Sequence, residues 1–478
     1  MDLKQYVTDC EQSINEVLTA FKISHGGMTA SPGPTVTLFE FKPVVGTRTS
    51  KIVNLRNELA IQLNVPSVRV IAPTEKGTVG IEVPNKERIV IPMADLLLSE
   101  EYRNTNMALP LCIGRKADCS LFMADLATMP HLLVAGATGM GKSVGLNVII
   151  SSLINKRSPD ELKFVLIDPK QVEFTVYEKI ERPYILKLHK DSSPVITDEK
   201  DALETLAAIC NLMDYRYSIL KAAGVRNLAE YNATVTEASA SGLSSIAAAG
   251  SGGKLPYIVV IIDEFADLML TSRTNKAILE EHICRIAQKA RAVGIHAIIS
   301  TQRPSIEFVT GCVKANFPAR LAFRTTTAID SRVILDRKGA ETLTGKGDFL
   351  FYDGGDFIRA QCAYISTNEV AQFCSTIQEK YLDRETALLK GQSDIPKIQL
   401  SASTIARLGD IMEYLYLSEQ TRKYLRITDT TLKELQLLGI VSTNATWDCH
   451  NKDGGYKVLI RSIKTANEII AKYATVTA

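Results

Sequence analysis

Residues 136–143 read Gly-Ala-Thr-Gly-Met-Gly-Lys-Ser and directly follow the apolar run His-Leu-Leu-Val-Ala. The loop has the G-x-x-x-x-G-K-[ST] spacing, and a helical run at 144–154 comes after it. The three glycines allow a tight turn whose N–H groups point toward phosphate oxygens. The helix that follows adds the positive end of its dipole. A strand, this loop and a helix in that order predict a site for a nucleoside triphosphate.

Each part of this loop has an expected task. Lys142 is expected to reach the β- and γ-phosphates, and Ser143 is expected to be a ligand of Mg²⁺. The residues expected to cradle the nucleotide are Gly136, Ala137, Thr138, Gly139, Met140, Gly141, Lys142 and Ser143.

Polar residues also end two other apolar runs, at the sheet edge where ligands bind in parallel α/β proteins. Asp263 and Glu264 follow the run 258–262. We expect Asp263 to hold Mg²⁺ and Glu264 to orient and deprotonate the attacking water. Gln302 follows the run 297–300 and is expected to sense the γ-phosphate or position water. The alternatives are acids that cap a strand into solvent and a glutamine in a plain turn.

A basic helical stretch with Arg285, Lys289 and Arg291 precedes the strand that leads to Gln302. A basic helix face is normally just solvated. An arginine here could instead act as a finger in the active site of a neighbouring subunit, which requires an oligomer.

Composition excludes several classes of protein. A chain of 478 residues, 46% hydrophobic and 23% charged, fits a soluble globular protein of two to four domains. Its net charge of +2 means that any nucleic-acid contact must come from local basic patches. Nine scattered cysteines without a C-x-x-C pair argue against zinc and a disulfide framework, and favour a reducing cytosol. The sequence shows neither a signal peptide nor a membrane span, so we expect a cytoplasmic chain that does not insert into membranes.

Three domains are predicted. Residues 1–105 are expected to form a small α+β domain with an amphipathic helix at its start, a second helix at 53–63, and strands at 35–41, 68–71, 80–83 and 88–91. Residues 106–395 predict an α/β domain with a parallel sheet, whose expected strands are 132–135, 164–167, 258–262, 297–300 and 320–323. Within it, the Ala/Ser/Thr/Gly-rich residues 233–254 are expected to form a mobile surface loop.

Residues 400–478 predict a third, small domain. The expected order is two helices and a two-stranded wing, at 405–416, 429–438, 440–442 and 456–460. This outline is typical of a winged helix-turn-helix, and a small helical packing domain is the alternative.

Together, the motifs resemble the motor of the FtsK/SpoIIIE DNA translocases over roughly residues 15–370. Besides the phosphate loop, they are Ile167-Asp-Pro-Lys, Gly224-Val-Arg-Asn-Leu, Ile261-Ile-Asp-Glu-Phe-Ala-Asp-Leu-Met, Ala287-Gln-Lys-Ala-Arg, Ser300-Thr-Gln-Arg-Pro, Ile329-Asp-Ser-Arg and Gly345-Lys-Gly-Asp. Upstream, Ser31-Pro-Gly-Pro-Thr-Val-Thr and Val83-Pro-Asn-Lys extend the same resemblance.

The resemblance implies a RecA-like ATPase domain after the family's α domain, with ATP and Mg²⁺ as ligands. It implies a homo-oligomeric, hexameric ring that pumps double-stranded DNA, as in chromosome segregation or mobile-element transfer. Gln302 is then the sensor and Arg291 the best candidate for the finger in trans, with Arg320 and Arg332 in reserve. Lys170 and Arg324 would face the nucleotide, the DNA channel or plain solvent.

Two features depart from the family. The end resembles its winged-helix γ domain, but Ile427-Thr-Asp-Thr-Thr stands where a basic lead to the recognition helix is expected. Full-length members carry membrane helices before the α domain, so this chain is expected to be a motor fragment, a soluble form or a mobile-element relative. The rival functions are a secretion-type ATPase that moves protein and a DNA-binding scaffold that does not hydrolyse nucleotide.

Overall fold

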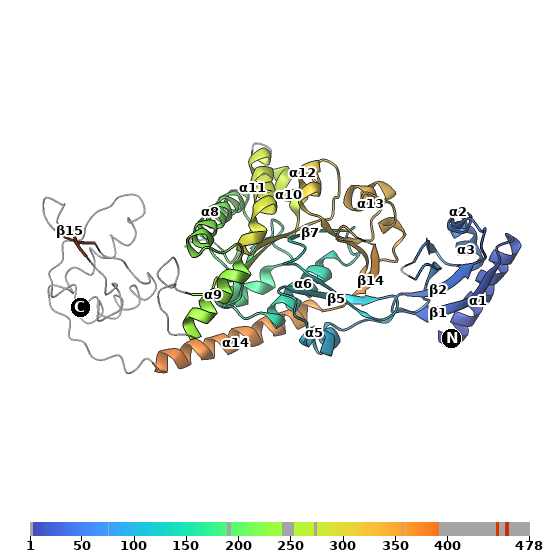
Figure 1. The fold of residues 1–478 in the computed structure, drawn as a ribbon, viewed down its shortest axis with the longest axis horizontal. Helices are drawn as coiled ribbons and strands as arrows, with labels where there is room; N and C mark the ends of the chain where they lie inside the picture. The colour runs from blue at the N-terminus through green and yellow to red at the C-terminus, as the bar shows by residue number, and fades with distance from the viewer. Residues whose placement is uncertain are drawn as a thin grey trace. The chain divides into compact units, whose positions relative to one another are not determined.

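The computed structural model describes residues 3–74, 76–188, 193–240, 253–271, 275–355 and 357–391, and two short strands at 446–448 and 455–457. It divides into two compact units, Met1–Asp383 and Arg384–Ala478. The predicted nucleotide site lies in the first unit, which holds an N-terminal domain and a large sheet with its helices (Figure 1). The domain bounds 1–105, 106–395 and 400–478 stay predictions.

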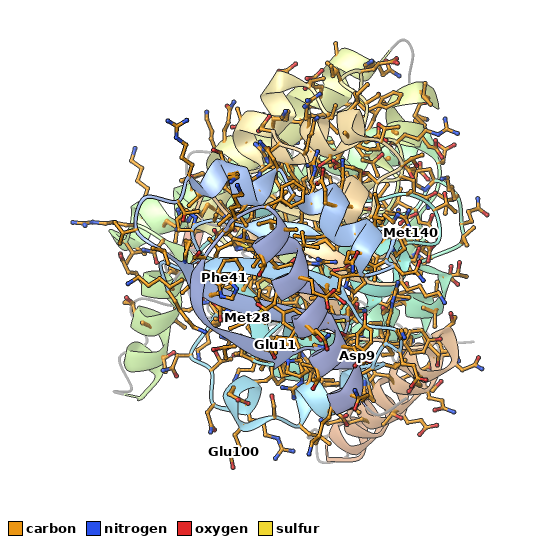
Figure 2. The ribbon with its side chains drawn as sticks, turned by 90° about the vertical axis from the view of Figure 1, so that its right-hand side faces the viewer. Asp9, Glu11, Met28, Phe41, Glu100 and Met140 are labelled. Atoms are coloured by element: carbon orange, nitrogen blue, oxygen red, sulfur yellow. A yellow bond between two sulfur atoms is a disulfide. The ribbon has the colours of Figure 1, made fainter. Side chains whose placement is uncertain are left out.

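The N-terminal domain is an antiparallel sheet of four strands in the order β1-β2-β4-β3, covered by helices. The strands are β1 (His25–Pro32), β2 (Val36–Pro43), β3 (Arg69–Ile71) and β4 (Val79–Pro84), and the helices are α1 (Leu3–Ala20), α2 (Thr49–Val53) and α3 (Arg56–Gln62). Helix α1, which carries Asp9 and Glu11, crosses in front of the strands that carry Met28 and Phe41 (Figure 2). Its buried residues Ile14 and Leu18 are one turn apart and face the core around Phe39 and Phe41.

This domain differs from the sequence predictions in three places, two wrong elements and one strand that was not predicted. The stretch 53–63, expected as one helix, spans the end of α2 and the separate α3. Strand β1 was not predicted, because its sequence of small and polar residues lacks apolar alternation. Residues 88–91 do not form a strand. There, Ile89 and Val90 are exposed, and the Arg88 side chain donates hydrogen bonds to the backbone of another segment.

The large sheet has ten strands in the order β6-β5-β14-β13-β12-β7-β11-β10-β8-β9. The run from β12 to β9 is parallel, and the remaining pairings are antiparallel. The parallel strands are β7 (His131–Ala135), β8 (Leu162–Ile167), β9 (Val195–Ile196), β10 (Tyr257–Ile262), β11 (Ile295–Thr301) and β12 (Ala319–Phe323). The antiparallel ones are β5 (Pro110–Lys116), β6 (Leu121–Asp125), β13 (Asp348–Tyr352) and β14 (Ile358–Cys362).

All five parallel strands predicted in this domain are therefore confirmed, together with the α/β fold class, whereas the antiparallel extension was not predicted. Helices cover both faces of the sheet (Figure 1). Along β7, Leu132 and Val134 join one hydrophobic core and Leu133 joins the other, as the alternation of a strand requires. One core is covered by α6 (Lys142–Lys156) and α14 (Thr367–Gly391). The other is covered by α8 (Glu199–Ala223), α10 (Phe265–Thr271), α11 (Lys276–Lys289) and α13 (Ala328–Leu335).

The loop expected at 233–254 is wrong in its first part. Residues up to 240 belong to α9 (Leu228–Ala240), in which Leu228 is buried and Tyr231, one turn later, joins the hydrophobic core. Residues 241–252 lie outside the described residues. So do the helices predicted at 405–416 and 429–438 and the strand at 440–442. In the second unit β15 (Thr446–Asp448) pairs with β16 (Gly455–Lys457), which overlaps the strand predicted at 456–460. The winged helix stays a prediction.

One cysteine pair is found in the described chain, which is not the disulfide framework that the sequence argued against. Cys284 of α11 and Cys312 of α12 (Gly311–Asn316) form a disulfide across 28 residues, a separation that no short motif reveals. The six other cysteines of the described chain are free thiols. Among the helices described, none has the length and apolar composition needed to cross a bilayer.

Candidate nucleotide-binding site

The phosphate loop connects β7 to α6, as the sequence predicted. Gly139 and Gly141 have φ angles of +74° and +118°, a region that side chains disfavour. A Cβ at Gly141 would lie 2.7 Å from the backbone nitrogen of Gly347, and one at Gly136 would lie 2.6 Å from Cβ of Phe323. Backbone conformation and lack of space both require glycine in this loop.

Lys142 and Asp263 meet in the interior of the site. The Lys142 ammonium donates to the Asp263 carboxylate at 2.8 Å and to the Asp263 carbonyl at 2.8 Å. It also donates to the hydroxyl of Ser300 at 3.2 Å. Burial raises the pKa of Asp263, and the positive charge of Lys142 opposes this shift. The carboxylate and the ammonium therefore stabilise each other at the ends of β7, β10 and β11.

Glu264 is fully buried, and its carboxylate has several fixed donors. The Thr301 hydroxyl donates to it at 2.7 Å, and the backbone N–H of Gln302 donates at 3.0 Å. The amide oxygen of Gln302 accepts a hydrogen bond at 2.8 Å from the hydroxyl of Thr138 in the phosphate loop. The structure thus brings Glu264, Gln302 and the loop together.

Lys170 faces this site as well. Its ammonium lies 3.4 Å from Glu264 and 3.2 Å from Asp267. Burial alone would lower the pKa of Lys170, but the hydrogen bond and charge of Asp267 and the charge of Glu264 outweigh it and raise the pKa. Among the roles that the sequence allowed for Lys170, this geometry favours the nucleotide site.

Glu173 is an acid of the site that sequence reasoning missed. Its carboxylate accepts a hydrogen bond from the Ser143 hydroxyl at 2.5 Å. Glu173 is held in place by the buried carboxylate of Asp168, which accepts hydrogen bonds from the consecutive backbone N–H groups of residues 170–174. The only sequence signal was its place just after the Ile167-Asp-Pro-Lys motif at a strand end.

The arginine candidates lie apart from these groups. Arg291 is exposed on a 3-10 turn, Ala290–Val293, that precedes β11. It is therefore at the opposite end of β11 from Thr301. Arg332 is exposed on α13. Arg320 is buried, and its guanidinium is paired with Asp336 and with backbone carbonyls of its own subunit.

Arg324 touches the phosphate loop through its backbone. Its carbonyl accepts the N–H of Ala137 at 2.9 Å, while the residue itself is exposed. The backbone contact ties the end of β12 to the loop.

The matches to known proteins agree with this geometry. Residues 92–306 match the FtsK/SpoIIIE family, and residues 2–85 match the FtsK alpha domain. The DNA translocase FtsK of Clostridium tetani is 42% identical over 383 residues, which are 79% of this chain and 48% of the relative. The DNA translocase FtsK of Haemophilus influenzae is 41% identical over 379 residues, 76% of this chain and 69% of the relative.

A solved structure of the pCW3 conjugation coupling protein TcpA with ATPγS shares the fold at a TM-score of 0.53 and 23% identity. The alignment covers 80% of this chain and 99% of that one. Fold and site together define a P-loop protein with the RecA-like fold. The chain belongs to the FtsK/SpoIIIE family, as its motifs predicted. It spans about half the length of the relative from Clostridium tetani.

Proposed function

We propose that this chain hydrolyses ATP and uses the energy to move double-stranded DNA, in chromosome segregation or mobile-element transfer. The observation that carries the proposal is the convergence of Lys142, Asp263 and Glu264 on buried strand ends beside a glycine-constrained phosphate loop. DNA as the cargo is supported by the family and by relatives named DNA translocases.

The residues present fit a magnesium nucleotide. Mg²⁺ prefers oxygen ligands, and the hydroxyl of Ser143 and the carboxylates of Asp263 and Glu173 provide them. When bound, the metal neutralises phosphate charge. Ser143 and Asp263 would hold it, and Glu173 would fix the Ser143 hydroxyl. Phosphate oxygens would replace the Asp263 carboxylate as partners of the Lys142 ammonium. Phosphate and carboxylate are both anionic, and the loop would direct the phosphate toward Lys142.

Glu264 would act as the general base. Its carboxylate cannot swing freely, because Thr301 and the backbone of Gln302 hold it. A base fixed in this way can orient a water molecule for attack on the γ-phosphate. Gln302 accepts a hydrogen bond from Thr138, so it would respond to the γ-phosphate through the phosphate loop.

The active unit would be a homo-oligomeric ring, hexameric as in the family, in the cytoplasm. Arg291 lies at the far end of β11 from its own site, so it would serve the site of a neighbouring subunit. With a net charge of only +2, the ring would concentrate basic groups along its DNA channel.

ATP hydrolysis measured with and without long duplex DNA tests the proposal, with Lys142→Ala as the inactive control. We expect duplex DNA to stimulate ATP hydrolysis strongly, with little dependence on the DNA sequence. The stimulation should fall steeply as the salt concentration rises. Hydrolysis that ignores DNA would favour a motor that moves protein. Absence of hydrolysis would favour the alternative of a DNA-binding scaffold that does not hydrolyse nucleotide. Normal hydrolysis by Lys142→Ala would contradict the assigned site.

A further inference from the structure

Two cysteines and a glutamate meet between α11 and α12. Glu280 and Cys284 are one turn apart on α11, and Cys312 is in the first turn of α12. The two Sγ atoms and a carboxylate oxygen of Glu280 all lie within 4.8 Å of one another. Cys284 is buried, Glu280 is half-buried and Cys312 is exposed, so the group can be reached from solvent. Because 28 residues separate the two cysteines, the sequence alone gives no metal-ligand spacing for them.

The backbone places the two cysteines at a distance that suits ligands of one metal ion. Their Cα atoms are 6.6 Å apart. Two thiolates on a tetrahedral Zn²⁺ have their sulfur atoms about 3.8 Å apart, because each Zn–S bond is about 2.3 Å long. A Cα separation of 6.6 Å leaves room for either a direct bond between the sulfurs or a shared metal ion. The helices therefore need not move between these two states.

Two of the three donors carry a hydrogen bond from a neighbouring side chain. The Thr310 hydroxyl donates to the Glu280 carboxylate at 2.6 Å. The side-chain amide of Asn316 donates to Sγ of Cys312 at 3.6 Å and to the Cys312 carbonyl at 2.8 Å. Such outer partners orient metal ligands and favour their charged forms. Two thiolates with one carboxylate favour Zn²⁺, whereas Mg²⁺ and Ca²⁺ prefer oxygen ligands alone.

We propose that Cys284, Cys312 and Glu280 bind a thiophilic divalent cation, Zn²⁺, when the two cysteines are reduced, with a water molecule as the fourth ligand. The disulfide and the metal site are alternative states of the same pair. A small-molecule dithiol breaks the S–S bond, each cysteine sulfur gains one electron and one proton, and the dithiol becomes its own disulfide. Metal binding then releases the two thiol protons to water.

The metal would join the two ends of a segment that includes proposed functional residues. Between Cys284 and Cys312 lie Arg291, the whole of β11, and Gln302. A link between α11 and α12 limits the freedom of this segment in the unfolded chain, and metal binding adds its free energy to folding. We therefore expect Zn²⁺ to stabilise the folded protein. The proposal does not depend on ATP hydrolysis, since its tests need no nucleotide.

Titration of the reduced, nucleotide-free full chain with Co²⁺ alone tests the site. Cobalt bound to thiolates has a charge-transfer absorption that oxygen ligands do not give. Cys312→Ser should lose most of this absorption. Glu280→Gln should weaken Co²⁺ binding at least about tenfold, because even outer-shell partners of metal ligands contribute about 10–100-fold. The matched controls, Cys119→Ser and Glu281→Gln, change an exposed free thiol and an exposed glutamate of α11, and both should bind Co²⁺ like the wild type.

Thermal unfolding with and without Zn²⁺ gives a second readout. Zn²⁺ should raise the unfolding midpoint of the reduced wild type and leave that of Cys312→Ser unchanged. The oxidised wild type should not respond, because its two sulfurs are bonded to each other. A thiol reagent confirms the redox state before each measurement. Three results would overturn the site: no thiolate absorption in the reduced wild type, equal absorption in Cys312→Ser, or an equal rise of the midpoint in the oxidised chain.

Discussion

The guanidinium of Arg359 on β14 lies 2.6 Å from the carboxylate of Glu82 on β4, so a buried ion pair joins the sheet domain to the N-terminal domain. Arg359 also binds Asp348 at 2.7 and 3.0 Å. Burial alone would raise the pKa of Asp348, but the charge and hydrogen bonds of Arg359 outweigh burial and lower it. Next in sequence, Gly347 donates its N–H to the Met140 carbonyl in the phosphate loop at 2.9 Å. The ion pairs between the two domains thus end at Asp348, one residue in sequence from a backbone hydrogen bond to the phosphate loop.

Arg359→Ala should lower the free energy of unfolding by about 3–5 kcal/mol, because it removes the cation paired with the buried carboxylate of Asp348 and leaves buried Glu82 with Arg69 at 3.3 Å. Urea unfolding at neutral pH measures this change. Arg285→Ala is the control, since its pair with Asp214 is largely exposed and should contribute less than about 1 kcal/mol. Equal effects from the two substitutions would mean that the buried network adds no stability beyond a surface pair.

Glu264→Gln should keep ATP binding and lose hydrolysis by about 10²–10⁴-fold, because the amide cannot accept the proton of the attacking water. The shape of the side chain is preserved, so its contacts to Thr301 and Gln302 can largely persist. Binding is measured by titration with ATP and turnover by phosphate release. The variant should also stay on DNA after binding ATP. Turnover close to the wild-type rate would assign the base to another residue.

Arg291→Ala subunits should lose hydrolysis alone and regain part of it when mixed with Lys142→Ala subunits. In mixed rings, some interfaces pair an intact phosphate loop with an intact Arg291 of the neighbour. Phosphate release measured across mixing ratios tests this expectation. A mixture that stays inactive at every ratio would favour a role of Arg291 within its own subunit.

Glu173→Gln should raise the Mg²⁺ concentration needed for half-maximal ATP hydrolysis, by about tenfold on the scale of outer-shell partners of metal ligands. The reason is that Glu173 orients the Ser143 hydroxyl through the 2.5 Å hydrogen bond. Titration of the hydrolysis rate with Mg²⁺ measures the shift. Glu178→Gln is a control in the following 3-10 helix, Thr175–Ile180. An unchanged Mg²⁺ requirement would limit Glu173 to a structural contact.

The free energy of unfolding should decrease as the pH falls from about 6.5 to 5. Burial lowers the pKa of His131 to about 3 and that of His296 to about 4. Both stay neutral in the fold while the unfolded chain takes up protons near the ordinary histidine pKa of 6.5. Each can therefore reduce stability by up to about 1.4 kcal/mol per pH unit in this window. Unfolding of wild type and His296→Gln across this range should give a smaller slope for the variant.

The sequence could predict the parallel strands because their residues carry a strong signal. All five residues of β7 are buried, so the strand reads as an uninterrupted apolar run. Strands β13 and β14 carry the buried charges Asp348 and Arg359, whose partners come from other strands and domains. Such charges look like surface residues in a sequence, and the antiparallel half of the sheet was therefore missed.

The candidate site likewise contains residues that the sequence could predict and residues that it could not. Lys142 follows the loop after β7, and Asp263 and Gln302 follow β10 and β11, so their places at strand ends predicted that they would lie at one edge of the sheet. Glu173 reaches Ser143 because hydrogen bonds to the Asp168 carboxylate hold the backbone of residues 170–174 in place. A sequence pattern does not reveal these hydrogen bonds. Ile89 and Ile91 alternate with other residues as a strand would, but both line the cavity beside the phosphate loop.

Residues 170–174, whose backbone N–H groups bind the Asp168 carboxylate, carry two side chains of opposite charge that contact the candidate site. Lys170 meets Glu264, the proposed base, and Glu173 meets Ser143, the proposed metal ligand. Because the hydrogen bonds to Asp168 join residues 170–174 into one piece, a movement of this loop would act on both positions at once. Loss of the Asp168 carboxylate would therefore disturb the surroundings of the proposed base and of the proposed metal ligand together.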